Sequence, residues 1–152
     1  MHIGNYIELV HHSEKDLALS FLKIEKAHGH EPDVAQACKL LSSWSSELVK
    51  KSEPFVAKYG EEKNKEPERL MHSLFKDTRK GSLALLRDLH DLWLMAQETA
   101  LCGLLLKQGA SGLRDKELIA FCDEIEYYSK RQTSWLLTRM KSAAPQTLIA
   151  AE

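Results

Sequence analysis

Long apolar runs, glycine and proline are all scarce in this sequence of 152 residues. No apolar stretch approaches the roughly 18 residues that suggest a membrane-spanning helix, and no basic segment followed by an apolar one opens the chain. We therefore expect no membrane span, no secretion signal and a cytoplasmic location. Seven glycines and four prolines are too few for a low-complexity chain, so the composition favours a compact globular protein.

Cysteine is also rare, and the three present are Cys38, Cys102 and Cys122. An odd number of widely spaced cysteines, each within an apolar helical pattern, favours reduced structural thiols over a disulfide framework. The chain is long enough to bury a sizeable core without cross-links or a structural metal.

An excess of either charge is absent, because 21 Lys and Arg face 22 Asp and Glu and the net charge is −1. Proteins that bind nucleic acids or anionic membrane surfaces usually carry an excess of basic residues, so we expect neither as a partner. The sequence also lacks a Gly-x-Ser-x-Gly elbow, a Gly-rich phosphate loop and a Cys-x-x-Cys pair. These absences disfavour several enzyme classes and leave a binding or structural role as the leading hypothesis.

Apolar residues recur at three- and four-residue spacing in four segments, which is the pattern of amphipathic helices. We predict one domain over 1–152, with helices over about residues 3–28, 33–59, 82–108 and 115–143 and a short helix over about 66–76. In the first helix the apolar positions are Tyr6, Val10, Leu17, Phe21 and Ile24, and Glu14 falls among the polar residues between them.

Helix ends are predicted from capping residues and prolines. Gly29 suits a left-handed C-terminal cap, while Ser82 and Asp115 suit N-terminal caps. Pro54 predicts a kink or break inside the second helix, and Pro145 predicts the end of the fourth.

The connections between the four helices are short, long and short. A helix of about 25 residues is about 37 Å long, and the twenty-odd residues of the middle connection can span that length. A crossover would make the second and third helices parallel and give two antiparallel hairpins, whereas a shorter excursion would give up-down-up-down packing. We favour the crossover, because a simple turn would not need so many residues.

Three segments, "EPDVAQACKLLSSWSSELVKKSEPFVAKYG", "LLRDLHDLWLMAQE" and "LRDKELIAFCDEIEYYSKRQTSWLLTRMKSAAPQ", cover about half of the chain. In them the sequence resembles the ferritin-like superfamily of helical bundles, in particular its small bacterial members without an assigned function. The resemblance implies an all-α four-helix bundle with a long crossover. Metal-binding members of the superfamily carry a Glu on each of two helices and Glu-x-x-His on each of the other two.

The motifs for a pair of metal ions are missing from this chain. Glu-x-x-His occurs at residues 8–11 and 25–28, but both lie on the first helix; Glu47 is followed three residues later by Lys50, and the fourth helix has no His. We therefore expect no standard metal centre and no cofactor. The alternative is an iron-binding protein or di-metal oxidoreductase with an atypical carboxylate site built from Glu14, Glu47, Glu98 and Glu126.

The histidines of the helix flanks, His11, His12, His28 and His30, are predicted to be surface residues. His90 shares its helix with Asp88 and Asp91 and lies one or two turns from Glu98. Asp91, His90 and Glu98 would support proton transfer if they faced the bundle interior. His90 falls beside the core stripe of that helix, so the sequence gives no direct support for this role.

The segment "LHDLWLMAQETALCGLLLKQG" is apolar on nearly every face, with Glu98 near its middle. One stripe, which includes Leu92 and Ala96, fills the bundle, and a second remains. We predict that the second stripe is covered by the short helix and by another copy of the chain in a homodimer, with interface residues Leu94, Glu98, Leu101 and Leu105. Glu98 is expected to pair at the rim of this contact without catalysis. Another protein or a small apolar ligand remains a possible partner.

Overall fold

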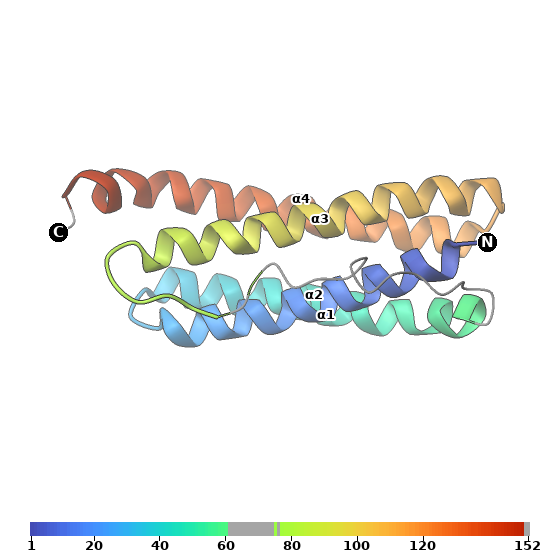
Figure 1. Ribbon diagram of the computed structural model, residues 1–152, viewed down its shortest axis with the longest axis horizontal. Helices are drawn as coiled ribbons and strands as arrows, with labels where there is room; N and C mark the ends of the chain where they lie inside the picture. Colours follow the sequence, from blue (N-terminus) through green and yellow to red (C-terminus); the bar gives the residue numbers. More distant parts are fainter. Residues whose placement is uncertain (61–74, 76, 151–152) are drawn as a thin grey trace.

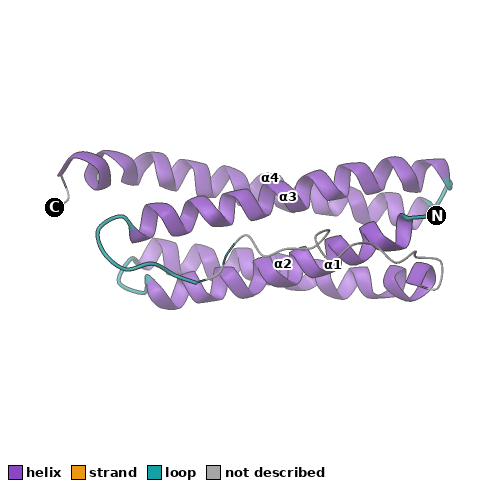
Figure 2. Ribbon diagram, in the orientation of Figure 1, coloured by secondary structure: helices purple, strands orange, loops and turns teal. Residues whose placement is uncertain are grey.

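The computed structural model describes residues 1–60, 75 and 77–150 of the chain. Its long helices are α1 (Ile3–Ala27), α2 (Pro32–Tyr59), α3 (Ala84–Gly112) and α4 (Lys116–Pro145), and the π-helical turn η3 (Gln146–Ala150) follows them. The described residues contain helices and connecting loops but no strand (Figure 2). The predicted all-α class is therefore confirmed. The predicted short helix over 66–76 lies outside the described residues except for Phe75, which is not helical.

Contacts between helix ends fix the direction of each helix in the bundle. At one end, His28 bonds Asp88 near the start of α3. At the other end, Tyr59 closes α2 and donates its hydroxyl to Asp115, directly before α4. The chain thus leaves α2 at one end of the bundle and enters α3 at the other, and α2 and α3 run in the same direction (Figure 1). The main packing partners are α1 with α2 and α3 with α4, while α1 also contacts α3 and α2 contacts α4.

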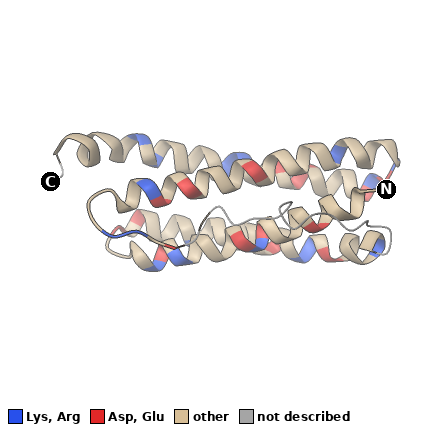
Figure 3. Cartoon of the chain, viewed as in Figure 1, with Lys and Arg blue, Asp and Glu red and all other residues tan. Residues whose placement is uncertain are grey.

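Charged residues of both signs are spread along all four helices (Figure 3). Within the described part of the chain, no helix is long and apolar enough to cross a membrane. Cys38, Cys102 and Cys122 are buried free thiols, as predicted. Burial raises the pKa of Cys38 to about 12, which keeps this thiol protonated.

Several predicted helix ends are wrong. Gly29 does not adopt the left-handed conformation, because the only residues with positive φ in the described ranges are Gly81 and Arg114. The residue before α3 is Leu83, with no side-chain cap, instead of Ser82, and α3 continues past Gly109.

The prolines interrupt the helices less than expected. α2 runs without a break through Pro54, whose ring lies on the exposed side of the helix, so that water can reach the backbone carbonyl that loses its partner. Pro145 is the last residue of α4, and η3 follows directly. Asp115 is an N-cap, as predicted, and its carboxylate accepts a hydrogen bond from the Leu118 backbone at 3.1 Å.

Among the described residues, the buried apolar side chains form two clusters, one in each half of the bundle. The cluster nearer the N-terminus of the chain contains Ile7, Leu9, Val10, Leu48, Tyr59, Cys102, Leu106, Ala110, Leu118, Phe121, Cys122 and Ile125. The other contains Leu17, Phe21, Ile24, Val34, Cys38, Leu41, Phe75, Leu89, Leu92, Met95, Ala96 and Leu136. The close approach of α3 and α4 requires Gly103, because a Cβ there would lie 2.8 Å from Cγ2 of Ile125.

Candidate functional site

A buried polar layer separates the two apolar clusters at the middle of the bundle. Every helix contributes to it, and every contributing side chain is at most 1% exposed: Glu14 of α1, Ser45 of α2, Thr99 of α3, and Ser129 and Gln132 of α4. On each helix these residues fall between members of the two clusters. Polar groups placed this deep need hydrogen-bond partners, so the layer is the feature of the core that most requires an explanation.

The hydrogen bonds of the layer satisfy only some of its polar atoms. Nε2 of Gln132 donates to Oγ of Ser45 at 2.8 Å and to the Leu41 carbonyl at 3.1 Å. Thr99 donates to a carbonyl of its own helix. In the described part of the chain, four buried oxygens have no partner: both carboxyl oxygens of Glu14, Oγ of Ser129 and Oε1 of Gln132.

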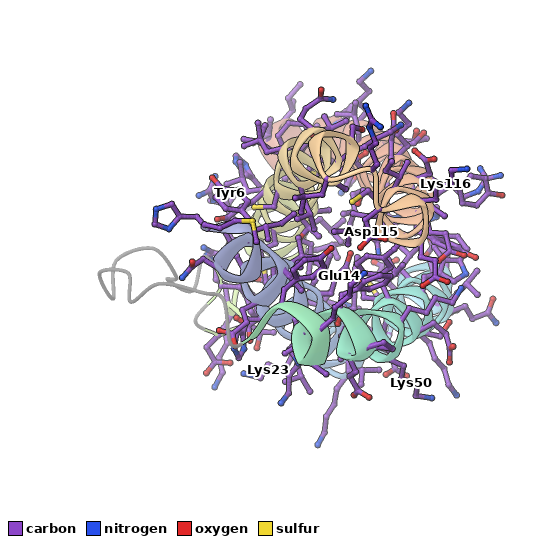
Figure 4. The ribbon with its side chains drawn as sticks, turned by 90° about the vertical axis from the view of Figure 1, so that its right-hand side faces the viewer. Tyr6, Glu14, Lys23, Lys50, Asp115 and Lys116 are labelled. Carbon is purple, nitrogen blue, oxygen red and sulfur yellow. The ribbon has the colours of Figure 1, made fainter. Side chains whose placement is uncertain are left out.

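Glu14 is the only ionisable member of this layer. In the end-on view of Figure 4 it lies between the helices, whereas Lys23 and Lys50 lie at the periphery. Burial raises the pKa of Glu14 to about 8, and the nearby Ser45 hydroxyl offsets this only in part, without forming a hydrogen bond of good geometry. The carboxyl group is therefore mainly protonated near neutral pH.

Glu14 was predicted among the polar positions of the first helix, but it is fully buried. Glu14 continues the buried stripe that runs through Val10 and Leu17 at three- and four-residue spacing. The same signal is present on α4, where Ser129 and Gln132 continue the buried stripe of that helix. A polar residue at a position that continues the apolar spacing of its helix is therefore the sequence feature that indicates the layer.

The four carboxylates of the alternative iron site do not come together. Glu14 is fully buried, while the Glu47 side chain is 61% exposed and lies near Lys50, and Glu126 pairs with Lys130 at the surface. Glu98 is half-buried on α3. Among the described residues, no group of three or more His, Cys, Asp or Glu side chains is arranged to hold a metal ion. The mid-bundle layer itself offers one carboxylate and no imidazole, which does not fit a pair of iron ions.

A second polar cluster lies at the end of the bundle, around Asp88. His28 was predicted to be a surface residue, but it is buried and its Nε2 lies 2.8 Å from Asp88. Asp88 also accepts hydrogen bonds from the Arg79 backbone and from Arg79 Nη1. Nη2 of Arg79 lies 2.7 Å from Asp91. These ionic contacts join the end of α1, the segment before α3 and the first turns of α3. His90 takes no part in them and lies near Arg87 instead.

An open cavity of about 450 Å³ adjoins this cluster, with His28, His30, Arg79 and Lys80 in its wall. The charges around it are largely compensated. Arg79 pairs with two aspartates, and Glu31, which also lines the cavity, pairs with Arg139. The lining therefore gives no clear preference for one class of ligand.

The outer face of α3 carries the second leucine stripe. Leu94, Leu101, Leu104 and Leu105 are 41%, 56%, 45% and 49% exposed. Glu98 lies within this face, and no described residue forms a hydrogen bond or an ion pair with it. Phe75, which was predicted to help cover the stripe, belongs to the core cluster and lines a groove on α1 with Leu19 and Leu22.

Comparison with known proteins adds no relative: no protein-family model, no curated protein and no solved structure matches this chain. Function is therefore inferred from the residues and their geometry alone.

The buried carboxyl group makes stability depend on pH. Between its ordinary pKa of 4.5 and the folded value of about 8, Glu14 keeps its proton in the folded state and loses it in the unfolded state. Stability should therefore fall as pH rises through this window, by up to about 1.4 kcal/mol per pH unit. We predict that Glu14→Gln removes this loss, so that thermal unfolding followed by circular dichroism gives a larger stabilisation at about pH 8 than at about pH 5. An equal effect at both pH values would contradict the assignment.

The Asp88 contacts should contribute strongly to stability. We predict that Asp88→Asn lowers the free energy of unfolding by about 2–3 kcal/mol, because His28 and Arg79 lose a fully buried partner. We expect a smaller loss of stability than for a fully buried ion pair, because the Arg79 side chain is 38% exposed. The control is Glu47→Gln at an exposed pair, with an effect below about 0.5 kcal/mol in urea unfolding. Similar small effects for both variants would show that the Asp88 contacts are not stabilising.

Proposed function

We propose that this chain is a ferritin-like four-helix bundle, with two antiparallel hairpins joined by a long crossover, that functions as a binding module. Its principal binding surface is the outer face of α3, and its partner there is a second copy of the chain. The observation that carries the proposal is the row of exposed leucines on this face: Leu94, Leu101, Leu104 and Leu105.

The chemistry of this face favours association. From residue 94 to residue 105, the exposed positions of α3 are four leucines and Gln97, and the half-buried Glu98 is the one charged residue of this stretch. The central part of a protein interface is depleted of charged residues in the same way. Covering apolar surface contributes about 25 cal/mol per Å², so four half-exposed leucines on each protomer provide a substantial driving force.

A second copy is a suitable occupant because a two-fold axis lets one face cover itself. An α3 helix laid against its symmetry mate buries the leucines of both chains in one contact. Glu98 is half-buried in the single chain and then lies within the interface area. A different protein partner or a small apolar ligand would use the same leucines but would leave the isolated chain monomeric.

We predict that the wild-type protein has about twice the 17.3 kDa chain mass in light scattering, and that Leu101→Glu shifts it to the monomer, because it places a charge among the leucines. The matched control is Leu40→Glu, since Leu40 is 53% exposed on α2 and lies away from this face. The control should remain dimeric. A monomeric wild-type protein at micromolar concentration, or the same measured molar mass for both variants, would contradict the proposed interface.

The alternative function, an iron-dependent oxidoreductase or iron-binding protein, needs carboxylates that the described residues do not bring together. We therefore predict that protein purified without chelators contains much less than one iron ion per chain by elemental analysis. About two iron ions per chain, lost in Glu47→Gln or in Glu126→Gln, would instead support the iron-binding function.

A further inference from the structure

We propose that the polar layer at the middle of the bundle binds a single monovalent alkali cation, coordinated by oxygens of Glu14, Ser129 and Gln132. This site is separate from the α3 face, so it goes beyond the proposed binding function and does not depend on it. Four fully buried oxygens of this layer lack a hydrogen-bond partner in the described part of the chain.

These oxygens belong to one small region. Gln132 donates a hydrogen bond to Ser45, and the Ser45 hydroxyl is near enough to Glu14 to lower the pKa of its carboxyl group. Ser129 lies one turn before Gln132 on the same buried face of α4. Buried polar groups without a protein partner commonly mark an ordered water molecule or an ion. The layer therefore has both the position and the unsatisfied atoms of a small coordination site.

The donor atoms select the class of ion. All four unsatisfied atoms are oxygens, from a carboxyl group, an amide and a hydroxyl. Alkali and alkaline-earth cations prefer such ligands, whereas zinc and iron sites in proteins usually include nitrogen or sulfur. Transition metals are accordingly poor occupants of this layer.

The charge of the layer selects a monovalent ion. Among the described residues, Glu14 is the only group of the layer that can become charged. The facing residues are Ser45 on α2, Thr99 on α3, and Ser129 and Gln132 on α4, all of them neutral. One carboxylate and one monovalent cation sum to zero. A divalent cation would leave an uncompensated positive charge in the core, which is costly.

The cation must compete with the proton of Glu14, because it binds the ionised carboxylate. Since burial raises the pKa of this group to about 8, the proton should win in mildly acidic solution and the cation in alkaline solution. This competition gives a signature that nonspecific salt screening does not produce.

The test compares melting temperatures of the wild-type protein in sodium, potassium and N-methylglucamine chloride at equal ionic strength, at about pH 6 and about pH 9. The large organic cation supplies the same ionic strength without a small ion that oxygens can coordinate. We expect sodium or potassium to raise the melting temperature by about 2–4 °C at the alkaline pH only. Identical melting temperatures in all three salts at both pH values would mean that water or a proton alone occupies the layer, and would overturn the proposal.

Variants locate the effect. Glu14→Gln should fold, because it keeps the size and shape of the side chain and removes only its ionisable group, and it should lose the alkali-cation effect completely. Ser129→Ala should weaken the effect. The control is Glu47→Gln, which removes a surface carboxylate and should keep the full effect. If the difference between salts persists in Glu14→Gln, the cation acts elsewhere and the assigned site is wrong.

Discussion

A carboxyl group without a counter-charge at the centre of the bundle is the constraint around which the interior is arranged. Glu14 is fully buried. At the same level, the other three long helices place a hydroxyl or an amide side chain where an aliphatic one would otherwise pack. The apolar core is consequently divided into two clusters. Packing alone would favour a leucine at such a position, so the layer costs stability that the two clusters must offset.

The ends of the bundle are held differently from its middle. At one end, Asp88 is surrounded by donors from His28 and Arg79. At the other, Asp115 accepts hydrogen bonds from Tyr59, Lys58 and a backbone N–H, and these bonds lower the pKa of its carboxyl group to about 2. The buried polar groups therefore have hydrogen-bond partners at both ends of the bundle, whereas several at its centre have none. Such a distribution is understandable if the centre has a ligand and the ends fix the helices around it.

Much of the helical arrangement could be predicted from the sequence, because apolar spacing reports directly on which helix face is buried. The four long helices begin and end within a few residues of their expected bounds, and Asp115 is the cap that its position suggested. The effects of Gly29 and Pro54 could not be predicted, since each is compatible with more than one local geometry and tertiary packing decides between them. The His28 contact with Asp88 joins residues 60 positions apart, and no local pattern predicts such a pair. Glu14 lies in step with the apolar stripe, but charged residues are rarely buried unless paired, so the sequence alone favours a solvent-facing side chain at this position.

The central claim, that the layer contains an uncompensated buried carboxyl group, is tested most directly by its own titration. In protein labelled with ¹³C at glutamate and kept free of alkali cations, the carboxyl carbon of Glu14, assigned with the help of Glu14→Gln, can be followed by NMR as pH changes. The structure predicts a midpoint near the raised pKa of about 8. A midpoint near the ordinary value of 4.5 would mean that Glu14 is paired or reaches water, and would contradict the account of the layer given above.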